Sequence, residues 1–404
     1  MLMAVLLCVA LSLDCYILLA LRARCRKQWP AKAYAVMSVV LAFLWGAILC
    51  MPIRGGGDDV LDTAMWMLIV FVSFTIPKFI FVVFDLLASI PRLWKGKRFK
   101  PLTMIGFILA LLAFSAIWWG TLINRYRTQT VEEEIFIPNL PEVFDGYRLV
   151  QFSDFHVGTY HNDTTFVHKV VTEINSLHPD MIVFTGDIVS RKSSELTPFV
   201  NTLSHLHAPD GVYSILGNHD YGDYYNWITP EAKQTNMEVM YDLQRRMGWH
   251  LLNNESVEIH RGNDSIVLIG VENIGDPPFP RYGNLEEAYP TPGDERVKIL
   301  LSHNPAHWVE DIANNAAQNV TLTLAGHTHA MQIAALGKSP ASMRYKTWGG
   351  LYADKDGRQQ LYVNIGVGTV GIPMRIGATP EITVLTLRKG NPSPDKFKLI
   401  TNND

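Results

Sequence analysis

Four apolar stretches near the N-terminus constrain the fold of this chain more than any other feature. They cover residues 1–21, 33–53, 65–90 and 102–123. Each is close to the ~20 residues that an α-helix needs to cross a bilayer. The first stretch could instead be a cleaved signal peptide, but it lacks a basic n-region and a small-residue cleavage site. We therefore predict an all-α transmembrane region with four helices over residues 1–123.

The loops between these stretches differ in charge. Residues 22–32 and 91–101 each carry five Lys or Arg, whereas residues 54–64 carry one Arg and three Asp. Cytoplasmic loops are enriched in Lys and Arg, so the first and third loops are predicted to be cytoplasmic. Four spans then place both termini outside the cytoplasm. The prediction is a multi-pass protein of the cell (inner) membrane with an extracytoplasmic C-terminal domain and the lipid bilayer as a partner.

Three charged side chains fall inside the apolar stretches, namely Asp14, Lys78 and Asp85. Because a charge in lipid is costly, such residues are by default a functional hypothesis. In the alternative interpretation Asp85 lies near the interface, while Lys78 snorkels or packs inside the bundle. We favour this structural interpretation.

The rest of the chain has the composition of a soluble protein. The net charge of -3 gives no indication of nucleic acid as a partner. All four cysteines lie within the first 50 residues, so residues 51–404 can hold neither a disulfide nor a Cys-based zinc site.

Strand-like apolar runs recur beyond residue 145, and several lead directly into polar side chains. The runs of this kind cover residues 147–152, 181–185, 211–216, 297–301 and 320–324. Residues 164–177 have helical spacing, and further strand signals cover 256–260, 265–271, 360–365 and 381–387. This alternation favours an α/β fold, a two-sheet sandwich flanked by helices. The expected organisation is a linker and opening strand over 124–145, the α/β domain over 146–390 and a polar C-terminal tail over 391–404.

Five polar motifs follow these runs along the chain. They are Ser153-Asp154-Phe155-His156, Gly186-Asp187, Gly217-Asn218-His219-Asp220, Ser302-His303-Asn304 and Gly326-His327-Thr328-His329. Since ligands bind at the carboxyl ends of strands in open sheets, the motifs can converge at one edge. Asp154 and His156 point the same way in an extended chain, and Asp187 offers two oxygens that could bridge two metals. Two ions ~3.5–4 Å apart would activate a water and neutralise phosphate oxygens.

Each motif alone has an ordinary explanation. Gly-Asp at a strand end is commonly a turn, Asn218-His219-Asp220 could be an Asx-turn or helix cap, and His303 could be an exposed histidine. The five motifs together, in one order and each at a strand end, are far less easily explained by chance. The combination therefore predicts a two-metal hydrolytic centre.

The order of the motifs resembles that of the calcineurin-like metallophosphoesterase superfamily over about residues 145–390. The resemblance implies a four-layer α/β/β/α sandwich with a dinuclear metal centre. The ligands that it implies for the first metal are Asp154, His156, Asp187 and His329. Those for the second are Asp187 as the bridge, Asn218, His303 and His327. It further implies that His219 protonates the leaving oxygen or stabilises charge on the phosphate, with Asp220 orienting His219.

Within the superfamily the chain most resembles the membrane-anchored bacterial branch, through Tyr147–Asp154, Asn364–Gly368, Arg375 and Pro380-Glu381. Some members of that branch cleave phosphodiester or pyrophosphate bonds in lipid-linked nucleotides. The branch usually has Gly-Gly-Gln after the last motif, where this chain has Ala330-Met331-Gln332. We expect Ala330 and Met331 to add side chains near the mouth of the site. Arg375 is expected either to contact a phosphate or to form a structural salt bridge.

The predicted function is that of a membrane-anchored, metal-dependent phosphoesterase. It would hydrolyse phosphodiester, pyrophosphate or phosphomonoester bonds with a two-metal-activated water, and a lipid-linked substrate is one candidate. The expected cofactors are two divalent ions, with Mn, Fe, Zn and Co all compatible with the mixed O and N ligands. The alternatives are a non-catalytic membrane scaffold or ligand sensor that retains the fold, and a transporter with an accessory soluble part. The complete ligand set favours the enzyme.

Overall fold

The expected apolar helices are present in the computed structural model, which describes residues 2–276, 279–289, 294–315, 319–392 and 397–399. Within these residues, four helices are long and apolar enough to cross a membrane, which confirms the prediction. They are α1 (Leu2–Arg24), α2 (Trp29–Cys50), α3 (Asp58–Ser89) and α4 (Lys100–Leu122). Helix α3 begins earlier than the apolar stretch because Asp58 and Asp59 occupy its first turn, where the helix dipole favours acidic side chains.

The chain divides into two compact units. The first is Met1–Ile123 together with the short segment Gly371–Met374, and the second is Asn124–Val370 together with Arg375–Asp404. The segment 124–145, expected as a linker and opening strand, belongs to the second unit and contains the strand β1 (Gln129–Ile137). Of the expected tail over 391–404, residues 393–396 and 400–404 lie outside the described residues.

The three charged side chains that fall inside the apolar stretches, Asp14, Lys78 and Asp85, are all paired. Lys78 Nζ lies 2.6 Å from Asp14 Oδ1, and the Tyr34 hydroxyl donates to the same oxygen at 2.5 Å, so one carboxylate joins α1, α2 and α3. Asp85 is fully buried and accepts from Arg24 at 2.8 Å and also from Arg98. These contacts agree with the structural interpretation of Lys78 and Asp85.

The second unit is built from short helices and strands. The helices are α5 (Thr165–Ser176), α6 (Val200–Leu203), α7 (Pro230–Arg246), α8 (Leu285–Ala288) and α9 (Pro305–His307). The strands that follow β1 are β2 (Arg148–Phe152), β3 (Met181–Phe184), β4 (Val212–Ser214), β5 (His250–Leu251), β6 (Glu255–Arg261), β7 (Asp264–Gly270), β8 (Lys298–Leu301), β9 (Leu322–Ala325), β10 (Gly350–Ala353), β11 (Gln360–Val363), β12 (Glu381–Lys389) and β13 (Lys398–Leu399).

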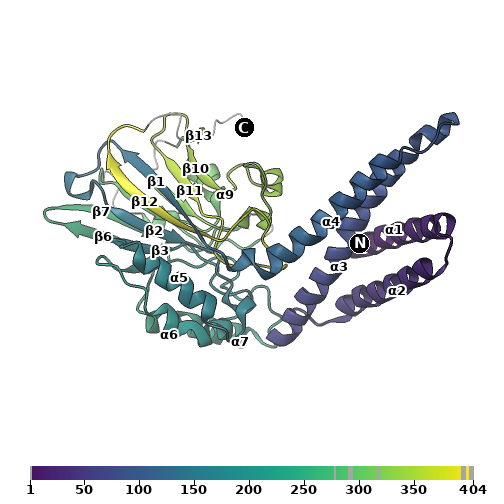
Figure 1. The fold of residues 1–404 in the computed structure, drawn as a ribbon. Helices are drawn as coiled ribbons and strands as arrows, with labels where there is room; N and C mark the ends of the chain where they lie inside the picture. The colour runs from purple at the N-terminus through teal and green to yellow at the C-terminus, as the bar shows by residue number, and fades with distance from the viewer. Residues whose placement is uncertain (1, 277–278, 290–293, 316–318, 393–396, 400–404) are drawn as a thin grey trace. The chain divides into compact units, whose positions relative to one another are not determined.

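Among the described residues these strands form two mixed sheets (Figure 1). One sheet has the order β1-β12-β2-β3-β4-β5, and the other has the order β13-β10-β11-β9-β8-β7-β6. In the first sheet β2, β3 and β4 are parallel, and in the second β7, β8 and β9 are parallel. Parallel neighbours in a sheet end at the same edge. The segments after β2, β3 and β4 therefore lie at one edge of the first sheet, and those after β8 and β9 lie at one edge of the second.

The core confirms a four-layer α/β/β/α sandwich. Alternate residues of a strand face opposite sides of its sheet. In β2, Leu149 therefore packs between the two sheets, whereas Val150 and Phe152 pack on the outer face with the apolar side of α5. In β8, Ile299 and Leu301 likewise face the other sheet. A third cluster, built around Trp308, covers the outer face of the second sheet.

The Asp14–Lys78 pair gives a prediction about the stability of the first unit. Both side chains are nearly buried, at 12% and 10% exposed. Removing one partner leaves a buried charge, so Lys78→Met should lower the free energy of unfolding by about 3 kcal/mol. The double variant Asp14→Leu/Lys78→Met should recover most of that loss, because neither charge remains. Thermal unfolding of the detergent-purified protein measures both, with the exposed Lys97→Met as control. A double variant as unstable as the single one would contradict this account.

Candidate metal centre

The backbone at the predicted ligands is unusual. Asp154, His156, Asp187, His327 and His329 all have positive φ, between 48° and 75°. For L-residues the left-handed region costs roughly 1–2 kcal/mol each, and such conformations cluster at functional sites. These residues lie two to four positions beyond the ends of β2, β3 and β9. The local strain therefore marks the same residues that the motifs do.

Two motif glycines are required by close packing against the carboxylates. A Cβ at Gly217 would collide with Oδ1 of Asp187, and a Cβ at Gly326 would collide with Oδ2 of Asp154. Glycine at these positions thus lets one motif approach another. This explains why the motifs that carry Asn218 and His327 begin with Gly.

The structure gathers the seven predicted ligands into two adjoining groups. Asp154, His156 and His329 form the first, with ligand atoms within 4.8 Å of one another. Nε2 of His156 lies 3.0 Å from Nε2 of His329, which in turn lies 3.3 Å from Oδ1 of Asp154. The structure thus brings together three of the four residues that the resemblance implies for a first metal.

The second group contains Asp187, His303 and His327, again within 4.8 Å. The Asn218 side-chain oxygen joins it, 2.8 Å from Nδ1 of His327 and 3.1 Å from Nε2 of His303. Oδ2 of Asp187 lies 3.3 Å from Nε2 of His303 and 3.7 Å from Nε2 of His156. A single carboxylate oxygen therefore stands between the two groups.

The outward-facing ring nitrogens explain how the imidazoles are oriented. Nδ1 of His156 contacts the Val189 carbonyl at 3.1 Å, and Nδ1 of His303 contacts the Thr185 carbonyl at 2.7 Å. An imidazole that donates its N–H to a carbonyl presents the lone pair of its other nitrogen to the centre, as in metal-binding histidines. Imidazoles, carboxylates and one amide suit divalent transition ions. The residues present therefore fit a pair of divalent metal ions.

The ionisable side chains of the centre shift one another's pKa values. Burial by itself raises the pKa of Asp187, but the neighbouring His303 and His219 hold the pKa of that carboxyl well below its usual range. Burial likewise opposes the charge on His303, yet Asp187 raises the pKa of that imidazole to about 9. Burial and the neighbouring His303 lower the pKa of His327 to about 3. These shifts favour an ionised Asp187, a protonated His303 and a neutral His327. Because metal ligands must be deprotonated, metal binding would release the proton of His303.

His219 lies beside the first group without joining it. Its ring is 4.9 Å from the ring of His156 and perpendicular to it, and its Nδ1 contacts the Ser190 carbonyl at 2.7 Å. Tyr224 stacks on the same ring, with centroids 4.1 Å apart, and its hydroxyl accepts from Asn218 at 2.9 Å. Since Nδ1 donates to a carbonyl, Nε2 is the nitrogen available for proton exchange.

The expected contact of Asp220 with His219 is wrong. The Asp220 carboxylate accepts instead from the backbone N–H groups of Asp187, Ile188, Val189 and Gly217, at 2.8 to 3.1 Å. It is fully buried and holds the turn that carries Asp187 against the turn that carries Asn218. The Ser190 carbonyl orients His219 in its place.

Arg375 fulfils neither expectation. It is fully buried and donates to the carbonyls of Gly368, Ala378 and Ile365, so it cannot meet a substrate phosphate, and within the described chain it has no ion pair. Its Nη2 also lies 3.2 Å from Nδ1 of His329, behind the first group. The guanidinium therefore fixes the loop behind the site.

The expectation for Ala330 is also wrong, while Met331 is half-exposed. Ala330 packs into a small cluster with Ile365 and Ala378 and is fully buried, so it does not reach the mouth of the site. Both residues are left-handed, with φ of 50° and 46°. This explains why the related branch has glycine at both positions.

One contact was not foreseen from the sequence. The Tyr345 hydroxyl lies 3.0 Å from Nε2 of His327. In His156 and His303 the corresponding ring nitrogen contacts a backbone carbonyl instead. No motif surrounds Tyr345, and the loop that returns it to the site has no periodic pattern. Only the tertiary structure could have identified it.

The comparisons with known proteins follow this geometry. A calcineurin-like phosphoesterase family model matches residues 147–331, and one described as "Probable Calcineurin-like phosphoesterase, transmembrane domain" matches residues 1–125. The metallophosphoesterase YkuE of Bacillus subtilis is 30% identical over 290 residues, covering 70% of this chain and 93% of YkuE. The chain belongs to the calcineurin-like metallophosphoesterase family. The sequence-based recognition is thereby confirmed.

Two further relatives are informative. One matches this chain over its membrane part as well, and the name of the other states an activity. The "Transmembrane protein with metallophosphoesterase domain" of Danio rerio is 28% identical over 389 residues, covering 91% of this chain and 83% of that protein. The "UDP-2,3-diacylglucosamine pyrophosphatase LpxG" of Chlamydia trachomatis is 29% identical over 299 residues, covering 61% and 86%. This metallophosphoesterase is thus a membrane protein of a family that uses divalent metals.

Tyr345 gives a prediction about metal affinity. If His327 binds a metal through Nδ1, its Nε2–H needs the Tyr345 oxygen as acceptor. Loss of such an outer partner typically weakens metal binding about 10- to 100-fold. Tyr345→Phe should therefore weaken one of two bound Mn²⁺ ions, as measured by competition with a chelator. Tyr289→Phe is the control, because that phenol contacts the backbone of Asn319. Unchanged affinity in Tyr345→Phe would contradict the assignment.

The left-handed backbone at Met331 gives a prediction about stability. Its side chain is 46% exposed and buries little. Met331→Gly should relieve the strain and raise the free energy of unfolding by about 1 kcal/mol. Met343→Gly is the control, because Met343 is 90% exposed and ends a 3₁₀ turn without positive φ. Equal effects of the two substitutions in thermal unfolding would contradict the strain argument.

Proposed function

We propose that this protein is a membrane-anchored phosphoesterase that hydrolyses phosphodiester, pyrophosphate or phosphomonoester bonds with two divalent metal ions. The observation that carries the proposal is the position of Asp187 Oδ2, 3.3 Å from His303 and 3.7 Å from His156. An oxygen shared by two ligand groups suits a bridge between two ions. The metal ligands in this proposal are Asp154, His156, Asp187, Asn218, His303, His327 and His329.

The chain's own residues would then bind and orient the phosphate. When bound, two such ions supply Lewis acidity toward phosphoryl oxygens and lower the pKa of a water. His219 is proposed to give a proton to the leaving oxygen from Nε2, while the Ser190 carbonyl holds Nδ1 at 2.7 Å. Tyr224 keeps the ring in place by stacking, and Asp220 positions the Asp187 turn.

A lipid-linked substrate is supported by two observations. The chain carries membrane-length helices, and the LpxG relative is named for a pyrophosphatase activity on a diacylated glucosamine nucleotide. A substrate with acyl chains would remain in the bilayer to which this domain is tethered. We therefore propose a phosphoester of a lipid as the substrate class.

An extracytoplasmic active site in the cell membrane is supported by the charges around α1–α4. The two Lys- and Arg-rich loops follow α1 and α3. Arg24 and Arg98, from these two loop regions, both contact Asp85, so the loops share one end of the bundle. That end is proposed to be cytoplasmic.

Two variants test the chemistry with bis(p-nitrophenyl) phosphate and detergent-purified protein. Asp187→Ala should abolish hydrolysis, because it removes the shared oxygen. His219→Ala should retain bound metal but lose about 10²–10⁴-fold in kcat, the usual contribution of a general acid. His260→Ala, exposed on β6, serves as control. Wild-type turnover in Asp187→Ala would refute the two-metal assignment, and metal loss in His219→Ala would make His219 a ligand.

The orientation is tested by protease accessibility. Protease added to spheroplasts should digest the domain after residue 124, whereas intact cells should protect it. The readout is immunoblotting of a C-terminal tag, with a cytoplasmic protein as the lysis control. A domain protected in spheroplasts and digested only after lysis would overturn the extracytoplasmic placement.

A further inference from the structure

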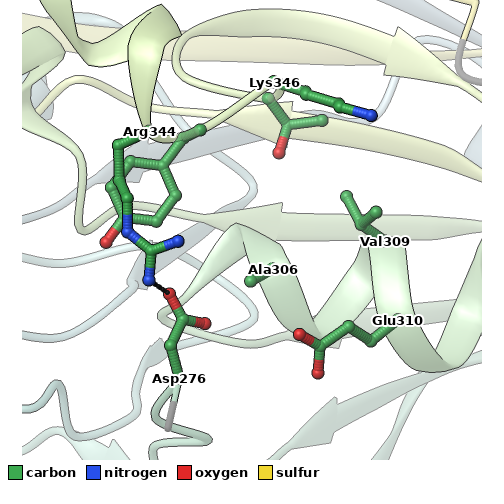
Figure 2. Close-up of a pocket in the computed structure, with 8 residues that line it drawn as sticks. Asp276, Ala306, Val309, Glu310, Arg344 and Lys346 are labelled. Carbon is green, nitrogen blue, oxygen red and sulfur yellow. Dashed lines mark hydrogen bonds and ion pairs between the residues drawn. The ribbon is translucent and has the colours of Figure 1, made fainter. Parts of the chain in front are cut away.

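The second unit contains a cavity of about 400 Å³ (Figure 2). Its lining includes Asp276, Ala306, Val309, Glu310, Arg344 and Lys346. Figure 2 shows Arg344 in contact with Asp276 on one side and Val309 and Glu310 on the other. Arg344 Nη2 lies 2.9 Å from Asp276 Oδ2. The cavity therefore combines an apolar floor with charged walls.

Two contacts link the lining of this cavity to the metal centre. Tyr345 lines the cavity and lies 3.0 Å from His327. Asn304 follows His303 in the chain and donates to Asp276 at 3.1 Å. One wall is thus attached to one histidine of the second group, and another wall to the other histidine.

The acidic residues of the cavity lining are paired with arginines, whereas Lys346 is not paired with a carboxylate among the described residues. Asp276 is paired with Arg344, and Glu310 lies 3.4 Å from Arg281. Lys346 is exposed, and among the described residues it forms no ion pair with a carboxylate. The two acidic groups are therefore occupied, and the Lys346 ammonium remains available to an anion.

Tyr345 adds a hydrogen-bond donor, an argument that rests on the proposed function. His327 would bind a metal through Nδ1, because that nitrogen faces Asn218 and His303. Its proton then resides on Nε2 and is donated to the Tyr345 oxygen. The phenol's own proton is left to donate elsewhere. The Arg344 guanidinium also lies over the Tyr345 ring, 5.3 Å from its centroid, and holds the ring in place.

We propose that this cavity binds the second phosphate of a pyrophosphate-containing substrate while the first phosphate occupies the metal centre. Lys346 and the Tyr345 hydroxyl are the groups that recognise it, and Arg344 holds the Tyr345 ring in place. A phosphodiester or monoester with one phosphate would leave the cavity unused. The cavity thus selects among the bond types that the metal centre alone could hydrolyse.

The test compares two substrates on the full-length, metal-loaded protein. UDP-glucose carries two linked phosphates, and bis(p-nitrophenyl) phosphate carries one. In Lys346→Gln, the ratio of kcat/KM for UDP-glucose to kcat/KM for bis(p-nitrophenyl) phosphate should fall about tenfold, the scale of one charge-assisted hydrogen bond. Lys355→Gln is the control, because Lys355 is exposed and does not line the cavity. An unchanged ratio would overturn the proposal.

A binding measurement separates this proposal from the proposed function. Calorimetry compares methylenediphosphonate, which has two anionic groups and resists hydrolysis, with methylphosphonate. Lys346→Gln should reduce the preference for methylenediphosphonate about tenfold. If the wild-type protein hydrolyses neither UDP-glucose nor bis(p-nitrophenyl) phosphate, the proposed function fails. Calorimetry still shows whether the cavity binds a second phosphate. Equal preference in variant and wild type would show that the cavity does not bind a second phosphate.

Discussion

The position of the Asp187 carboxylate is the constraint on which the rest of the site depends. One of its oxygens lies between His156 and His303, which follow strands of different sheets. The other oxygen accepts a hydrogen bond from the backbone N–H of His219 at 2.8 Å. Asp220 holds the Asp187 turn from behind through backbone amides. Gly217 must lack a side chain so that the turns can approach. Sandwich geometry, local strain and glycine placement therefore all converge on one side chain.

The residues that gather at the site could be predicted because their signal is local. Each lies two to four residues beyond the end of an apolar strand. Since parallel strands end at a shared edge, the motifs imply convergence without knowledge of the loops. The strands that the sequence did not indicate, β5, β10 and β13, are short or lie at or near sheet edges, where the apolar pattern is weak.

What could not be predicted depends on how loops return to the site. Tyr345 reaches His327 across an irregular segment, and no residue pattern near it indicates that contact. The family resemblance implied that Asp220 orients His219, but the Asp220 side chain turns toward buried backbone amides that need an acceptor. Arg375 was expected either to contact a phosphate or to form a structural salt bridge. It is buried because three backbone carbonyls compensate its desolvation.

Two ions bound on either side of Asp187 are the central claim, and anomalous diffraction tests it most directly. Crystals of the full chain grown with Mn²⁺ and measured at the manganese edge should give two peaks about 3.5–4 Å apart. One peak should adjoin Asp154, His156 and His329, and the other Asn218, His303 and His327, with Asp187 between them. A single peak, or two peaks that do not share Asp187, would contradict the account.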